Sequence, residues 1–139
     1  MTEEGLQREN ERLQRLITEL EQRCTELQDK LVLFQYTIDA LPQTLFWKDC
    51  DLIYRGCSQR FADFAGCASP EELAGKTDYD LAWKPEESEA FQADDREVLK
   101  TARPKYHIME TQRHADGTET WVETSKAPIR APMVRSSVW

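Results

Sequence analysis

The side chains that could ligate a metal or act as nucleophiles include four cysteines and two histidines. No two cysteines form a Cys-x-x-Cys pair, the spacing in which zinc sites usually take their ligands. The histidines supply no second pair at helical spacing either. The pattern therefore favours reduced, partly buried thiols over a metal site. The residues concerned are Cys24, Cys50, Cys57, Cys67, His107 and His114.

Four aspartates could act in acid–base catalysis or hold a cation: Asp78, Asp80, Asp94 and Asp95. The first two lie beside predicted short turns, where aspartate binds backbone amides. The other two fall on a predicted helix, on a solvated face, and lack the oxygen-rich loop of an EF-hand. The sequence contains no phosphate-binding glycine loop, Ser/His/Asp constellation or kinase motif. It therefore predicts no catalytic residue and no enzyme activity.

A long helix is predicted for residues 1–41, which contain no proline and carry apolar residues in two interleaved seven-residue series. Leu at d, with mostly aliphatic a positions and one Asn, predicts a parallel, left-handed coiled-coil dimer. A helix packed on its own domain would need a wider apolar face, and a DNA-binding zipper would need a preceding basic region. The predicted dimer interface is Leu6, Asn10, Leu13, Ile17, Leu20, Cys24, Leu27, Leu31, Phe34 and Ile38.

From Pro42 the chain takes the pattern of a mixed domain, predicted to span residues 42–130. Two short aromatic runs around residues 49–51 predict a hairpin. Ser58 and Ser69 have the context of helix N-caps, and Pro85 opens a longer helix to about residue 102. Residues 106–111 and 120–126 flank a turn signal and predict a second hairpin. The order predicts an α+β fold with an antiparallel sheet and flanking helices.

Several motifs in this region resemble the PAS family, and most closely the PAS domains of bacterial multidomain sensor proteins. The resemblance covers roughly residues 36–130 and rests on Phe46-Trp47-Lys48-Asp49, Ser69-Pro70-Glu71-Glu72, the stretch 75–83, Ala93-Asp94-Asp95 and the stretch 116–126. Ser58 and Ala82 depart from it, where relatives often carry Asn and Pro. Similar domains precede histidine kinases, diguanylate cyclases and further PAS units, and the upstream helix resembles the signalling coiled coils that join such units.

The resemblance implies a ligand pocket between sheet and helices, although each residue of the set could equally be ordinary core. Light-sensing flavin-binding relatives need a Cys in the stretch that here reads Gly75-Lys76-Thr77-Asp78, and haem-binding relatives use a His on the long helix. Both are missing, so neither a flavin adduct nor a haem ligand is predicted, and the ligand stays unknown. The candidate pocket residues are Phe46, Tyr54, Phe61, Phe64, Trp83, Phe91 and Trp121.

The formal net charge of −8 predicts that neither nucleic acid nor an anionic membrane is a partner. No apolar run approaches the ~20 residues of a bilayer span, and no secretory signal is recognised, so we expect a cytoplasmic protein. The predicted function is a homodimeric sensory module, as in two-component systems, that relays a stimulus to an output domain absent from this chain. The alternative is a ligand-free dimerisation scaffold that recruits a protein partner.

Residues 131–139 depart from the resemblance after Arg130, where similar domains continue with an Asp-Gly turn and a central Val-rich strand. Inserting a single nucleotide into one permitted coding of this tail yields Asp-Ala-Asp-Gly-Gln-Val-Val-Gly-Val. We therefore hypothesise an aberrant, frameshifted tail, an idea that fails if the gene encodes no such strand in any frame downstream of Arg130.

Overall fold

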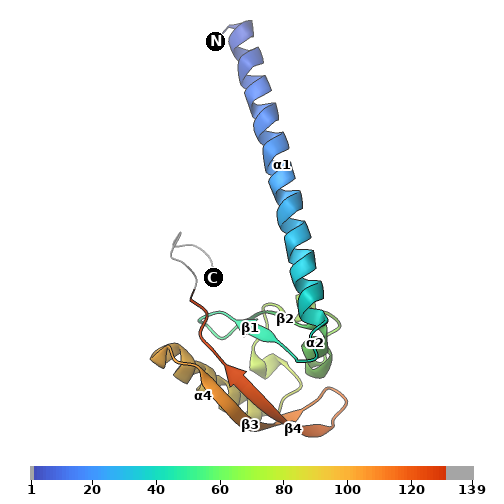
Figure 1. Cartoon of the computed structure of the whole chain (residues 1–139), viewed down its shortest axis with the longest axis vertical. Coiled ribbons are helices and arrows are strands. Elements are labelled where there is room, and N and C mark those ends of the chain that lie inside the picture. Colours follow the sequence, from blue (N-terminus) through green and yellow to red (C-terminus); the bar gives the residue numbers. More distant parts are fainter. Residues whose placement is uncertain (1, 131–139) are drawn as a thin grey trace. The chain divides into compact units, whose positions relative to one another are not determined.

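A computed structural model describes residues 2–130 (Figure 1), so the hypothesised aberrant tail lies outside the described residues. The chain divides into two compact units, one up to Leu41 and one from Pro42. Among the described residues, no helix is both long and apolar enough to cross a bilayer.

The first unit is a single helix, α1 (Glu3–Asp39), about 55 Å long at ~1.5 Å per residue. Thr2 caps its start by accepting a hydrogen bond from the Gly5 amide, and Glu3 and Glu4 face the positive end of the helix dipole. The predicted long N-terminal helix is confirmed. Nine of the ten predicted interface residues are exposed in the single chain, whereas Ile38 is buried.

The second unit begins with an antiparallel hairpin of β1 (Phe46–Lys48) and β2 (Tyr54–Cys57), whose register shifts between Trp47 and Lys48. Asp49 shapes the turn by accepting hydrogen bonds from the amides of Asp51 and Ile53. On its other edge β2 exchanges backbone hydrogen bonds with residues 75 and 76.

Helices follow where the sequence carries capping residues. Ser58 accepts a hydrogen bond from the Phe61 amide, and Ser69 accepts one from the Glu72 amide, so both predicted N-caps are observed. Gly66 ends its helix in the left-handed conformation that glycine adopts most readily. The elements are α2 (Gln59–Ala65), α3 (Pro70–Leu73), the short 3₁₀ helix η1 (Asp78–Asp80) and α4 (Pro85–Thr101).

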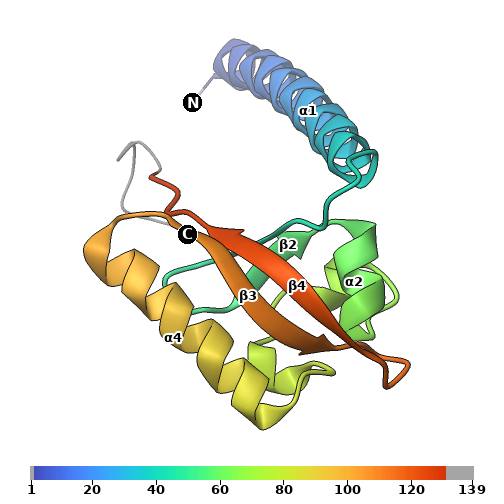
Figure 2. The ribbon, with the colours of Figure 1, turned by 60° about the horizontal axis from the view of Figure 1, so that its bottom comes forward.

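The last described elements of the unit form a longer antiparallel hairpin of β3 (Lys105–Arg113) and β4 (Glu119–Lys126), along which α4 lies (Figure 2). Asp116 stabilises its turn by accepting hydrogen bonds from Thr118. The predicted α+β order of hairpin, helices and hairpin is confirmed. Within residues 2–130 the strands form two separate two-stranded sheets, because neither strand of one hairpin pairs with a strand of the other.

Candidate functional site

Aromatic side chains from the first hairpin and from the helical segment that follows it meet in the core of the second unit. The Phe46 and Phe61 rings lie 4.8 Å apart, Phe61 and Trp83 5.8 Å, and Trp83 and Phe91 6.0 Å, while Tyr54 lies 5.7 Å from both Phe46 and Phe61. Five of the seven candidate pocket residues therefore form one continuous cluster. They come from β1, β2, α2, α4 and the segment before α4.

The other two candidate pocket residues lie elsewhere. Phe64 packs edge-on against His114, with 4.5 Å between the ring centroids. Trp121 is 71% exposed on β4. Side chains alternate along a strand, and Val122, Thr124 and Lys126 are the more buried set of β4, so Trp121 falls on the opposite face.

Beside the aromatic cluster lies a buried ionic network, which we define as Tyr54, Asp78, Lys48, Asp95 and Lys126. The Lys48 ammonium is 2.5 Å from Asp78 Oδ2 and 2.5 Å from Asp95 Oδ2. Asp95 Oδ1 lies 2.8 Å from the Lys126 ammonium, and the Tyr54 hydroxyl donates to Asp78 Oδ1 at 2.7 Å. Asp95 therefore joins β1 to β4, whose backbones do not pair.

The network is charge-balanced and shielded from water, with two ammonium groups facing two carboxylates. The four charged side chains are between 0% and 10% exposed. Burial, together with the neighbouring Asp78 carboxylate, holds the Tyr54 pKa well above its usual value. The nearby Trp83 indole lowers the Tyr54 pKa, against the effect of burial. Its buried N–H nevertheless meets no acceptor at full hydrogen-bond geometry.

One further acidic residue, Glu110 on β3, lies at the edge of this network. Its burial raises its pKa to about 7, and the nearby Asp94 acts in the same direction, while Lys126 and the Thr124 hydroxyl act against the shift. One of its carboxyl oxygens is buried without a hydrogen-bond partner.

The sequence correctly places Asp78 beside a short turn, since Asp78 begins η1, but its side chain binds Lys48 and Tyr54 and not the expected backbone amides. The solvated face expected for Asp94 and Asp95 is wrong. Asp78 is fully buried and bonded to Lys48 and Tyr54, whereas Asp95 bridges two lysines inside the domain. Asp94 pairs with Lys105 at the edge of the same region. Neither network lysine, Lys48 or Lys126, was predicted from the sequence as a functional residue. For Lys48 a signal was available: it directly follows the aromatic pair Phe46-Trp47, and a short aromatic strand favours burial of the residues within it.

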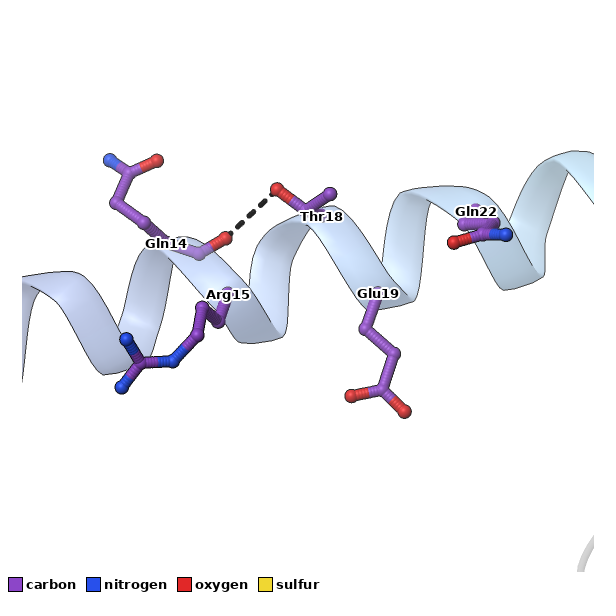
Figure 3. Close-up of a pocket in the computed structure, with 5 residues that line it drawn as sticks. All are labelled: Gln14, Arg15, Thr18, Glu19 and Gln22. Atoms are coloured by element: carbon purple, nitrogen blue, oxygen red, sulfur yellow. Dashed lines mark hydrogen bonds between the residues drawn. The ribbon is translucent and has the colours of Figure 1, made fainter.

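Neither metal chemistry nor a pocket on α1 adds to this site. In residues 2–130 no three His, Cys, Asp or Glu side chains gather as metal ligands would. A shallow depression on α1 is lined by polar side chains outside the a and d positions of the heptad seam, and Thr18 there donates to the Gln14 carbonyl at 3.0 Å (Figure 3). It is ordinary solvent-facing helix surface.

Solved structures of similar fold include the protein VqmA. VqmA bound to DPO has 22% sequence identity and a TM-score of 0.62, covering 74% of this chain and 49% of that one. Vibrio cholerae VqmA in complex with ligand and DNA has 20% identity and a TM-score of 0.61, covering 74% and 43%. A Vibrio cholerae VqmA dimer without target DNA has 22% identity and a TM-score of 0.62, covering 74% and 45%. No curated protein matches the sequence.

These structures contradict the expectation that nucleic acid is not a partner, since VqmA is a dimeric protein of this fold in complex with DNA. The expectation rested on the net charge of −8. It fails because this chain spans about half of the VqmA chains, so the net charge of this portion does not decide what a whole protein of this kind binds.

The PAS fold family matches residues 38–133, a range that holds the aromatic cluster, the ionic network and both hairpins. The match covers more than half of the chain and agrees with the observed order of strands and helices. This chain belongs to the PAS family and carries a domain of the sensory type.

Proposed function

We propose that the chain is a homodimeric sensory module, in which a stimulus at the PAS domain changes the packing of an α1 coiled coil and is relayed to an output region. The observation that carries this proposal is the exposed heptad seam of α1. Large apolar side chains along it, such as Leu20 and Leu27, are about 60% exposed in the single chain. A second parallel helix would cover them all.

The physical basis of the relay is that a coiled coil has discrete alternative packings. Only a few residues of chain separate the end of α1 from β1, so a change in the PAS core that moves β1 can be passed to the coiled coil. Asn10, at an a position, would meet its partner across the dimer axis and penalise other registers. The output region could be catalytic, as in histidine kinases, or a DNA-binding region, as the likeness to VqmA suggests.

We propose no catalysis by this chain itself. Each aspartate considered for acid–base chemistry is already held by another group: Asp78 and Asp95 by the network lysines, Asp94 by Lys105, and Asp80 by the amide and hydroxyl of Thr77. A cytoplasmic location accords with four cysteines that form no disulfide.

Cysteine cross-linking tests the dimer. Cys24 occupies an a position and should face its counterpart across a parallel dimer, whereas Cys50 is also exposed but lies in the β1–β2 turn. Mild oxidation should give a disulfide-linked dimer in the wild type and in Cys50→Ser, but not in Cys24→Ser. Cross-linking that depends on Cys50, or a chain that sediments as a monomer, would refute the proposal.

A second candidate function is the ligand-free scaffold, favoured by the close packing of the aromatic cluster. Within residues 2–130, the depression on α1 and the one between the end of α4 and the start of β3 both lie away from these rings. Native mass spectrometry on protein purified from its own host separates the two functions. A retained small molecule supports sensing, and a bare dimer that captures a protein partner supports the scaffold.

A further inference from the structure

The surroundings of the Lys48 ammonium have the composition of a site that recognises amines. Its nitrogen contacts two carboxylates, at 2.5 Å each, and lies 4.6 Å from the centre of the Tyr54 ring and 5.7 Å from that of Phe46. Aromatic faces and carboxylates are the groups by which proteins recognise organic cations. The site is well shielded, since the Lys48 side chain is 6% exposed.

The charge balance of the network restricts what could replace this ammonium. Asp78 and Asp95 are matched by Lys48 and Lys126. Another monovalent cation would preserve the balance, whereas an anion or a neutral molecule would leave a buried carboxylate unpaired, which is strongly unfavourable. Among the charged members of the network, the exchangeable one must therefore be a lysine.

The two lysines differ in how firmly they are held. The Lys126 ammonium also donates to the Phe91 carbonyl at 2.9 Å, and its backbone is paired within the long β3–β4 hairpin. Lys48 is the last residue of the short β1, at the register shift, and is followed by exposed residues 50 and 51. Its flexible stem can therefore swing outward while the carboxylates stay in place.

An independent observation also indicates a ligand at this position. The Trp83 indole N–H is buried close enough to the Tyr54 hydroxyl to lower the Tyr54 pKa, but it makes no hydrogen bond of full geometry. Trp83 is only 6% exposed. A buried donor without an acceptor is uncommon in native proteins and often marks a missing water or ligand atom.

We propose that Asp78, Asp95 and the rings of Phe46 and Tyr54 form a binding site for a small primary alkylammonium ion, and that Lys48 itself occupies this site when no ligand is bound. The inference rests on the proposed sensory function and names the ligand class. A ligand would take over the contacts to both carboxylates but would not reproduce the covalent tie from the ammonium to β1. Binding therefore releases β1 from η1 and α4, which is the change that a sensor needs to transmit.

The test is chemical rescue of Lys48→Ala. The substitution removes three carbons and the ammonium, so n-propylammonium has the size and charge of the missing group. We expect n-propylammonium chloride to raise the melting temperature of this variant by about 4 °C or more relative to sodium chloride at equal ionic strength. Tetrapropylammonium, with the same charge but too bulky for the site, should give no such increase.

Lys105→Ala is the matched control, because Lys105 also pairs with two carboxylates, Asp94 and Glu97, but in a site that is 38% exposed at the lysine. It should show no specific rescue. The wild type should need at least a tenfold higher propylammonium concentration than Lys48→Ala for the same shift, because its own lysine competes at high effective concentration. Equal responses of Lys48→Ala to propylammonium and sodium, or equal responses of Lys48→Ala and the wild type, would overturn the proposal.

The result does not depend on a stable variant. If Lys48→Ala is unfolded in sodium chloride, recovery of its near-ultraviolet circular dichroism with propylammonium is the rescue, and no recovery refutes the site. The experiment also separates this inference from the dimer proposal. Cys24 cross-linking reports on α1 alone, whereas rescue reports on the PAS core alone.

Discussion

Trp47 and Gly56 face each other across the β1–β2 hairpin, and their contact explains why glycine stands at position 56. A Cβ atom built on Gly56 would lie 2.1 Å from Cζ2 of the Trp47 ring, far inside van der Waals contact. The indole therefore covers the bare backbone of the neighbouring strand. This contact fixes the pairing of β1 with β2 at the residue directly before Lys48.

Gly56→Ala should destabilise the domain by about 1–3 kcal/mol, because the added methyl group overpacks against a large ring. Urea denaturation followed by circular dichroism measures the loss. The control is the double variant Gly56→Ala/Trp47→Ala, in which the ring is gone and the added methyl group should cost much less than in the wild-type background. The same loss from Gly56→Ala in both backgrounds would show that the Trp47 contact is not its cause.

Glu110 should make stability depend on pH. Its pKa is raised to about 7 in the folded chain from an ordinary value of 4.5, so the folded state binds the proton more tightly than the unfolded state. The contribution of Glu110 to the free energy of unfolding is then fully present below about pH 4.5, and it is lost as the pH rises through 7. Glu110→Gln, which cannot ionise, should flatten the profile over this range and be more stable than the wild type at pH 8.

Melting temperatures between pH 4.5 and 8 for the wild type and Glu110→Gln measure the effect of Glu110. Glu86→Gln, an exposed substitution on α4, controls for the loss of any carboxylate. Parallel profiles for the wild type and Glu110→Gln would contradict the raised pKa.

At the scale of elements, α4 connects two hairpins that share no backbone pairing within residues 2–130. One oxygen of Asp95 bonds to Lys48 on β1, and the other bonds to Lys126 on β4. A single carboxylate therefore links the strand that opens the PAS unit to the strand that closes its second hairpin. The ionic network has an architectural role in addition to any role in binding.

Asp95→Asn and Lys126→Met should each cost about 3–5 kcal/mol of unfolding free energy, since each leaves a buried charge without its partner. The double variant should cost less than the sum, because both substitutions remove the same ion pair. Equilibrium urea unfolding measures all three. Lys84 and Glu119 form a matched exposed pair, and Lys84→Met/Glu119→Gln should leave the urea midpoint almost unchanged. Additive losses at Asp95 and Lys126 would show that the two residues act independently.

At the scale of the whole molecule, the first unit and the PAS unit pose different stability problems. The PAS unit has its own core, built around Tyr54, Phe61 and Trp83. The α1 helix buries only Ile38 along its length in the single chain. Helices gain most of their stability from packing of an apolar face, so α1 depends on a partner surface.

Leu20→Glu should convert the proposed dimer to a monomer, because it places a charge at a d position in the centre of the seam. Sedimentation velocity at micromolar concentration distinguishes the two states. Leu33→Glu is the matched control, since Leu33 is similarly exposed on the same helix but lies at a c position away from the seam. A dimer that survives Leu20→Glu but not Leu33→Glu would place the interface on the opposite face of α1.

The sequence by itself determined the features that depend on near neighbours. The heptad spacing predicted α1, Ser58 and Ser69 predicted two helix starts, and Asp116 with Gly117 predicted the turn of the second hairpin. Helix caps, turns and periodic faces involve residues a few positions apart, so their signals are contained in short windows of sequence.

Tertiary structure alone decided which charges are buried and which aromatic residues meet. Lys48 contacts Asp78 and Asp95 across 30 and 47 residues of chain, and the local pattern around each aspartate is that of an ordinary turn or solvated helix. Trp121 had the same aromatic character as Trp83, yet the pleat of β4 turned it outward. Burial depends on what the fold brings against a side chain, and a charge becomes stable inside only when its partner arrives from a distant segment.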